Sequence, residues 1–224
     1  MYISQHQIGD LIMQKFINIT GYFNIAAGVV LLAFWFLYAL LLPYQKLDHT
    51  LSILVNNQHW GLVNILGVAG SILGLIGLVG IYIQNAEATQ TAGMVGFLLA
   101  FIGTVLLTAA LVWDTVIWPI LVGHDASLLD FNGPIYASRT FVPFFIIAGI
   151  IYSLGYLILG ITLARSGVNP FWGSLMIAFG APLFGLGAMF GKLQVYPRTI
   201  GVTLFCIGLI WFGSMMRSTQ FQSR

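Results

Sequence analysis

The sequence predicts an all-α fold, a polytopic membrane helix bundle of six transmembrane helices that forms one membrane domain over residues 1–224. The chain is 59% hydrophobic and only 6% charged, whereas soluble domains contain about 25% charged residues. Its apolar runs are long and continuous, without the alternation of barrel strands. Because lipid cannot hydrogen-bond to the backbone, such runs must form helices.

Six apolar runs reach the length of about 20 residues that a spanning helix needs. They cover residues 21–42, 60–83, 93–116, 141–164, 171–190 and 199–216. Pro43, Pro119, Pro170 and Pro197 stand at the ends of runs, where proline ends a helix at little cost. Pro182 lies within the fifth run and predicts a kink that frees a carbonyl.

Two segments outside the runs are amphipathic. Residues 1–19 place Leu11, Ile12 and Phe16 opposite polar positions. This pattern predicts either an interfacial N-terminal helix or the first turns of the first spanning helix. Residues 119–140 form the longest polar connection, an outer amphipathic loop in which we expect a short surface helix starting at Gly123 or Asp125.

The two halves of the chain show a faint internal similarity. Ala27-Gly28 matches Ala148-Gly149, and Ile102-Gly103 matches Ile207-Gly208, in the same order. Three spans per half would give a 3+3 inverted repeat, as in many transporters. Chance similarity among glycine-rich helices is the alternative.

The charges leave the orientation open. With six spans, four basic residues fall on each side of the membrane, so the positive-inside rule selects neither side. We place the termini in the cytoplasm, so that the two longer connections face outward together. The low charge predicts a lipid bilayer as partner and excludes a nucleic-acid surface.

Asp114 is the main site candidate, because a carboxylate in or near hydrocarbon is normally paired or turned toward a cavity. Its alternative role is a solvated carboxylate in an interfacial belt formed by Trp113 and Trp118. The remaining ligand or cavity candidates are residues expected near the same face or at the kink: Trp113, Trp118, Asn64, Arg139 and Pro182. The expected partner of Asp114 is either Arg139, at the start of the fourth run, or the indole donor of Trp113 or Trp118.

Imidazoles and carboxylates concentrate on the side away from the termini. The candidate metal ligands there are His49, His59, His124, Asp125 and Asp130. Such side chains bind zinc, copper or iron, but their spacing matches no ligand signature. The alternative is a set of solvated loop residues, and no cofactor is expected beyond this metal or haem reading.

Several short motifs in the second half carry a resemblance. They are Trp113-Asp114, Trp118-Pro119, Leu128-Leu129-Asp130, Gly133-Pro134, Leu154-Gly155-Tyr156 and Gly180-Ala181-Pro182. In these the chain resembles a group of uncharacterised bacterial six-helix integral membrane proteins. The resemblance implies a bacterial cytoplasmic (inner) membrane and no particular activity.

Three functions remain open from the sequence. The first is a bundle without a catalytic signature that binds a membrane partner subunit, a lipid or a small apolar ligand. The second is a small transporter or channel that uses Asp114 in an intramembrane cavity. The third is an outer-face metal- or haem-dependent enzyme that uses the three histidines of that side.

Overall fold

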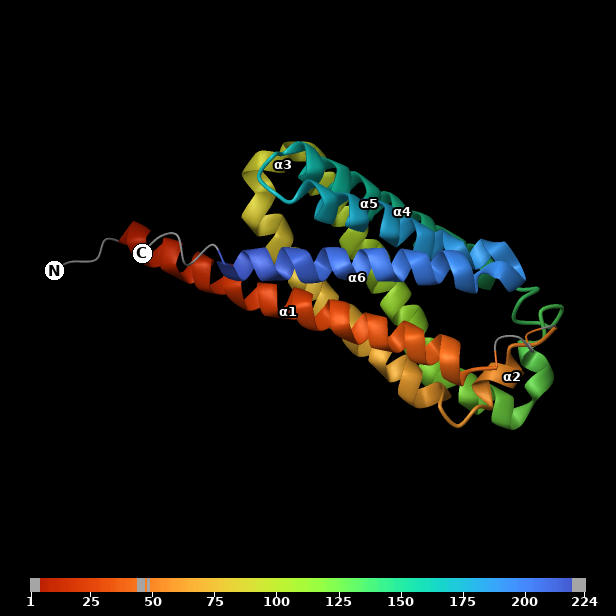
Figure 1. Cartoon of the computed structure of the whole chain (residues 1–224). Helices are drawn as coiled ribbons and strands as arrows, with labels where there is room; N and C mark the ends of the chain where they lie inside the picture. The colour runs from red at the N-terminus through yellow and green to blue at the C-terminus, as the bar shows by residue number, and fades with distance from the viewer. Residues whose placement is uncertain (1–4, 44–46, 48, 219–224) are drawn as a thin grey trace.

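The computed structural model describes residues 5–43, 47 and 49–218, and the described part is helical apart from short connections. The elements are α1 (Gln5–Leu41), α2 (Ser52–Val55), α3 (Trp60–His124), η2 (Ala126–Leu129), α4 (Phe141–Arg165), α5 (Phe171–Gly185), η3 (Leu186–Leu193) and α6 (Val195–Ser218). The predicted all-α bundle is confirmed (Figure 1). Four helices are long and apolar enough to cross a membrane: α1, α3, α4 and α6.

The 65-residue α3 is a helical hairpin (Figure 1). Gln90, with φ 52° and ψ −148°, leaves the helical region and reverses the chain. Near the open ends of the hairpin, the Trp60 Nε1 donates a hydrogen bond of 2.8 Å to the Asp114 carbonyl oxygen. Near the bend, the Tyr82 and Phe97 rings stack at 4.3 Å. Residues 60–89 and 91–124 are therefore two antiparallel arms.

Close approaches at glycines define the order of the helices. Arm 60–89 packs on α1, where a Cβ at Gly67 would lie 3.0 Å from the Phe34 ring. Arm 91–124 packs on α4, where a Cβ at Gly96 would lie 2.6 Å from the Leu159 nitrogen. α4 packs on α5, α5 on α6, and α6 on α1. Small residues thus let membrane helices approach closely, and the six rods close into a ring.

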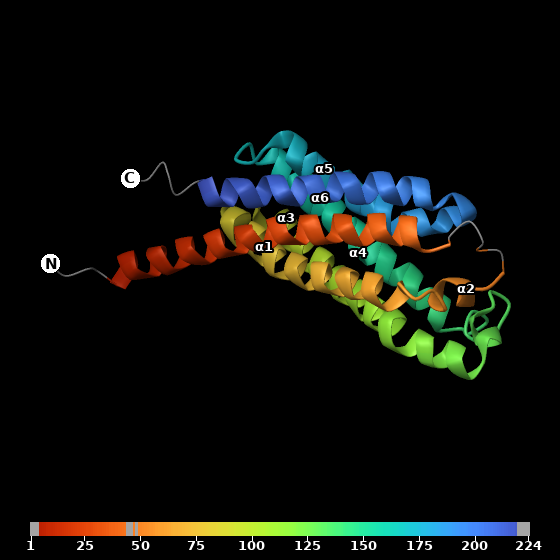
Figure 2. The same ribbon diagram turned by 60° about the horizontal axis from the view of Figure 1, so that its bottom comes forward.

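The first helix is longer than its predicted apolar run. α1 is continuous from Gln5 to Leu41, so residues 5–19 are the first turns of this helix, the second of the two alternatives. These turns extend past the end of α6 (Figure 2). Residues 1–4 lie outside the described part.

Pro119 does not end its helix, contrary to prediction. α3 continues through it to His124, and the last turn is closed by the bond from the Asp125 N–H to the Leu121 oxygen, 2.8 Å. A proline removes one backbone bond. Burial of Trp118 and Val122 in a local apolar cluster with residues of α2 and η2 keeps the helix in place.

The outer loop begins at Asp125. Its carboxylate accepts bonds from the Ser127 backbone N–H, 2.9 Å, and hydroxyl, 2.8 Å, and so caps η2. These two bonds lower the pKa of the exposed Asp125 carboxyl. The loop then pairs with residues 49–51, where the Leu51 N–H donates to the Leu129 oxygen at 3.0 Å.

The predicted fifth run, 171–190, is not one α-helix. α5 ends at Gly185 and the chain continues as the 3-10 helix η3. Pro182 lies one turn before this change, and the Leu186 N–H bonds to its carbonyl oxygen. The expected irregularity thus lies at the end of α5, beside the cavity described below.

The inverted repeat stays a prediction. Its equivalences pair Gly103 with Gly208, but Gly103 faces Tyr152 of α4 whereas Gly208 faces Ile177 of α5. Equivalent positions of an inverted repeat would place Gly208 against α1. The glycine contacts therefore give the repeat no support.

Candidate functional site: an internal polar cavity and its apolar groove

A cavity of about 270 Å³ lies inside the ring of helices and is lined by residues from α1, both arms of α3, α4, α5 and α6. Most of its wall is apolar. The polar and charged lining residues are Tyr38, Asn64, Ser71, Thr104, Asp114, Tyr152, Tyr156 and Arg198. Two of them are charged, the acidic Asp114 and the basic Arg198, so the cavity contains one charge of each sign.

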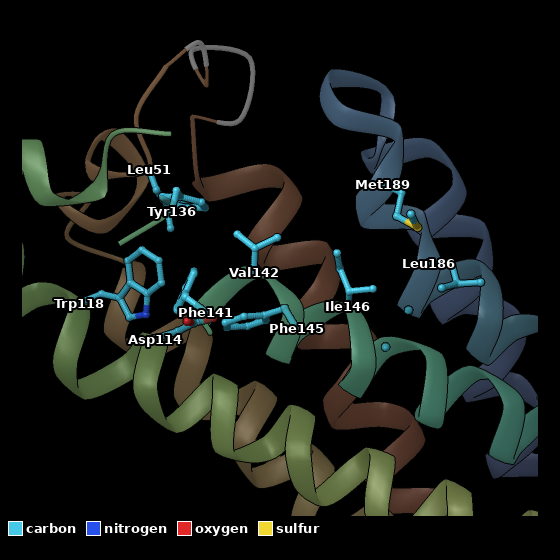
Figure 3. Close-up of a pocket in the computed structure, with 12 residues that line it drawn as sticks. Leu51, Asp114, Trp118, Tyr136, Phe141, Val142, Phe145, Ile146, Leu186 and Met189 are labelled. Atoms are coloured by element: carbon cyan, nitrogen blue, oxygen red, sulfur yellow. The ribbon is translucent and has the colours of Figure 1, made fainter. Parts of the chain in front are cut away.

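Asp114 projects from arm 91–124 and is half-buried. The bond from Trp60 to its carbonyl oxygen fixes its backbone. Arg198 is near enough to act electrostatically on its carboxyl, although no ion pair within 4 Å is found in the described part of the chain. The Trp118 Nε1 points toward the carboxyl (Figure 3). The two charges therefore share the cavity without closing on each other.

Arg198 enters the cavity from the first turn of α6. Its guanidinium lies over the Trp35 ring at 4.5 Å and over the Phe184 ring at 4.7 Å. Its Nη1 donates to the Gln194 Oε1 at 3.3 Å. Such cation–π contacts are strongest where water is excluded. The guanidinium is thus held in place by rings and retains unused donors.

The Trp35 indole is held by a hydrogen bond and by contacts to its ring. Its Nε1 donates to the Thr199 Oγ1 at 2.7 Å, and the Tyr38 ring stacks on it at 5.4 Å, nearly parallel. With Arg198 over the ring, the π surface of Trp35 has little room for another cation.

Two tyrosines of α4 complete the inner wall. The Tyr152 and Tyr156 rings meet at 4.9 Å, and the Tyr156 hydroxyl lies 3.2 Å from the Thr104 Oγ1. The Thr104 hydroxyl in turn donates to the Ala100 carbonyl oxygen at 2.7 Å. These hydroxyl contacts join arm 91–124 to α4.

An apolar groove of about 390 Å³ adjoins the cavity, and Figure 3 shows the residues that line it. Its walls are apolar side chains of α4, η3 and the outer loops: Leu51, Tyr136, Phe141, Val142, Ile146, Leu186 and Met189. Ile146 and Met189 are strongly exposed. The groove is therefore open at the surface of the bundle, with apolar side chains around its mouth.

Four residues belong to both the groove and the cavity: Asp114, Phe145, Gly149 and Gly185. A Cβ at Gly149 would meet only the Gly185 oxygen, at 3.6 Å. The two glycines thus leave a passage between α4 and α5. We call it the glycine passage.

Unsatisfied polar atoms gather around this site. Among the described residues, the Ser153 Oγ and the Arg198 Nε are buried without a hydrogen-bond partner, whereas the Trp118 Nε1 faces the Asp114 carboxyl. Arg198 lines the cavity, and the Ser153 Oγ would lie 2.8 Å from a Cβ at Gly185. Buried polar groups normally have partners, so a ligand with acceptor oxygens suits these donors.

The predicted cavity residues are partly brought together. Asp114 and Asn64 line the cavity and Trp118 lines the groove. Trp113 points away, 45% exposed, into a separate apolar depression. Arg139 lies exposed in the connection before α4, so the expected pairing with Asp114 is wrong, and Arg198 takes its place.

Pro182 lines neither the cavity nor the groove. Arg198, Trp35, Tyr152 and Tyr156 line the cavity but were not among the predicted site residues. Arg198 directly precedes the sixth predicted run, on the side assigned to Asp114. A cation so close to that run was the available signal.

The predicted metal ligands do not form a metal centre. His49, His124 and Asp125 are exposed, and His59 and Asp130 are half-buried. Over the described ranges, no three His, Cys, Asp or Glu side chains are grouped as a metal ion requires. Asp125 instead caps η2, and Asp130 pairs with Thr50 in an isolated bridge.

The fold and site together define an integral membrane helix bundle in which an inner cavity with one acidic and one basic residue adjoins an apolar groove. Comparison of the chain with protein-family models, with curated proteins and with solved structures found no match.

Proposed function

We propose that this protein binds a lipid-like amphiphile, with its chain in the groove and its polar group in the cavity. The position of Asp114 is the observation that carries the proposal. Its side chain lies where an apolar groove and a polar cavity share a wall. Ligand sites are typically apolar hollows with a few placed polar groups, and an amphiphile matches the two parts of this one.

The unpartnered polar atoms favour binding over simple packing. Leaving a buried donor unsatisfied costs about 1–3 kcal/mol, and one such donor, the Arg198 Nε, belongs to a residue that lines the cavity. A bound polar group with acceptor oxygens relieves that cost, whereas a purely packed interior does not.

Native mass spectrometry of the protein in dodecyl maltoside tests the proposal. The probes are four oleoyl amphiphiles, offered singly: lysophosphatidylethanolamine, lysophosphatidylcholine, lysophosphatidylglycerol and monooleoylglycerol. We expect at least one to give an adduct that saturates at one molecule per chain.

Gly149→Leu should abolish that adduct because its side chain fills the glycine passage. Gly149→Ala keeps the comparison valid if the larger variant is unstable, since it narrows the passage while making only an ordinary contact at 3.6 Å. Gly61→Leu is the matched control, because a Cβ there has no neighbour within 4 Å. Adducts that never saturate, or that bind Gly149→Leu as well as the wild type, would refute the proposal.

We also propose the setting of this activity. Six membrane crossings are supported by the two arms of α3 and by η3, which continues the 15-residue α5. A bacterial cytoplasmic membrane is supported by the resemblance of the second half to bacterial six-helix proteins. Termini in the cytoplasm and membrane partner subunits remain parts of this proposal.

A second candidate function is transport of the same class of amphiphile. It is favoured by the change from α5 to η3 beside the cavity, since interrupted helices surround the sites of many transporters. In proteoliposomes, fluorescently labelled lysophosphatidylethanolamine should become accessible to external dithionite faster with the wild type than with Gly149→Leu. Equal rates of dithionite access for the two proteins would refute transport and leave amphiphile binding as the function.

A further inference from the structure

We infer that the ligand is zwitterionic and carries a primary amine, with its phosphate on Arg198 and its ammonium on Asp114. The inference rests on the proposed function and names the chemistry of the polar group. It follows from the charges in the cavity, the unpartnered donors, and the occupied face of Trp35.

The net charge of the cavity favours a zwitterionic ligand. Asp114 and Arg198 are the charged residues that line the cavity, and together they are neutral. A ligand with net charge would leave one buried charge in excess, which is strongly unfavourable in apolar surroundings. A zwitterion satisfies both residues and keeps the site neutral.

The N–H donors of Arg198 indicate where the phosphate of the ligand binds. The Arg198 Nε is buried without a partner, and the guanidinium is held over Trp35 and Phe184. A planar guanidinium with free N–H groups matches phosphate oxygens. The phosphate therefore belongs in the inner cavity, beside α6.

The Asp114 carboxylate indicates where the amine of the ligand binds. The Asp114 side chain lies in the wall shared with the groove, and a carboxylate accepts N–H bonds from an ammonium. A quaternary ammonium has no N–H to donate and is instead bound by aromatic faces. On the inner side of the cavity, the face of Trp35 is already covered by Arg198 at 4.5 Å and stacked by Tyr38, so it does not offer a site to a quaternary ammonium. A primary amine is therefore favoured.

The experiment is a competition in native mass spectrometry, with the four oleoyl probes offered together at equal concentration. Their acyl chain is the same, so differences report the polar group. For the wild type we expect lysophosphatidylethanolamine to exceed each other probe by about tenfold, the value of one charge-assisted hydrogen bond.

Two variants change the order in opposite ways. Asp114→Asn leaves the cavity with a net positive charge, so anionic lysophosphatidylglycerol should become the preferred probe. Arg198→Gln removes the phosphate contact, so the advantage of lysophosphatidylethanolamine over monooleoylglycerol should disappear. If the Arg198→Gln protein is unstable, the double variant Asp114→Asn with Arg198→Gln takes its place, because it removes both charges from the cavity.

Asp125→Asn and Arg139→Gln, exposed residues outside the cavity, are the matched controls and should keep the wild-type order. An unchanged order in Asp114→Asn, or equal binding of all four probes to the wild type, would overturn the inference while leaving amphiphile binding intact. Failure of every probe to bind would instead refute the proposed function itself.

Discussion

Gly155→Ala should destabilise the bundle far more than Gly149→Ala, although both residues lie on α4. A Cβ at Gly155 would stand within 2.5 Å of the Ala100 Cα, in the backbone of arm 91–124. A backbone cannot rotate away as a side chain does, so the two helices must separate. A Cβ at Gly149 meets only an oxygen at 3.6 Å, an ordinary contact.

The two changes share the same helix-propensity gain of up to about 1 kcal/mol, which cancels between them. Their difference therefore reports the overpacking cost, about 3 kcal/mol at the upper end of the usual range. That is roughly a hundredfold in the ratio of folded to unfolded protein.

Reversible unfolding in mixed micelles, followed by circular dichroism, gives the free energy of unfolding for both variants. Gly149→Ala is the matched control, with the same substitution on the same helix. Equal stabilities would show that arm 91–124 and α4 do not approach as closely as the Gly155 contact requires.

Three further perturbations test other parts of the structure. Thr199→Val removes the acceptor of a buried indole N–H bond of 2.7 Å and should cost about 1–3 kcal/mol; an unaffected unfolding free energy would contradict that bond. Asn169→Ala removes the donor to the buried Asn85 Oδ1, 2.8 Å away, with a similar loss of about 1–3 kcal/mol, and wild-type stability would argue against the contact. The Asp125 carboxyl, followed by its ¹³C shift, should titrate below the usual pKa of an aspartate. Its capping contribution is therefore present above the unfolded-state pKa and is lost as the pH falls through the lowered one. Ser127→Ala should raise that pKa, and no change on substitution would rule out the cap.

The helices were predictable because their signals are local. Each apolar run follows from composition alone, and α4 begins at Phe141 as expected. The end of the third run was not predictable from Pro119, because the burial of Trp118 depends on α2 and η2, distant in sequence. The expectation that proline ends a helix considers only neighbouring residues, so it does not include this packing.

The site was only half predictable for the same reason. Asp114 is conspicuous as an acid near the end of an apolar run. Its cationic neighbour is chosen by which helices close the ring, and α6 meets α1 where Trp35 and Thr199 bond. Arg139 was the nearer candidate in sequence, but it precedes α4 in an exposed connection. Ring closure is a property of the whole chain.

The single non-helical residue at Gln90 also bears on how the protein is made. The polar turns on either side of it, within residues 84–91, are helical too, so the two arms are joined without a flexible loop. We expect such a pair to enter the bilayer as one hairpin, with its polar bend left at one surface. The direction of that hairpin is then a property of the pair, which suits a chain whose basic residues favour neither side.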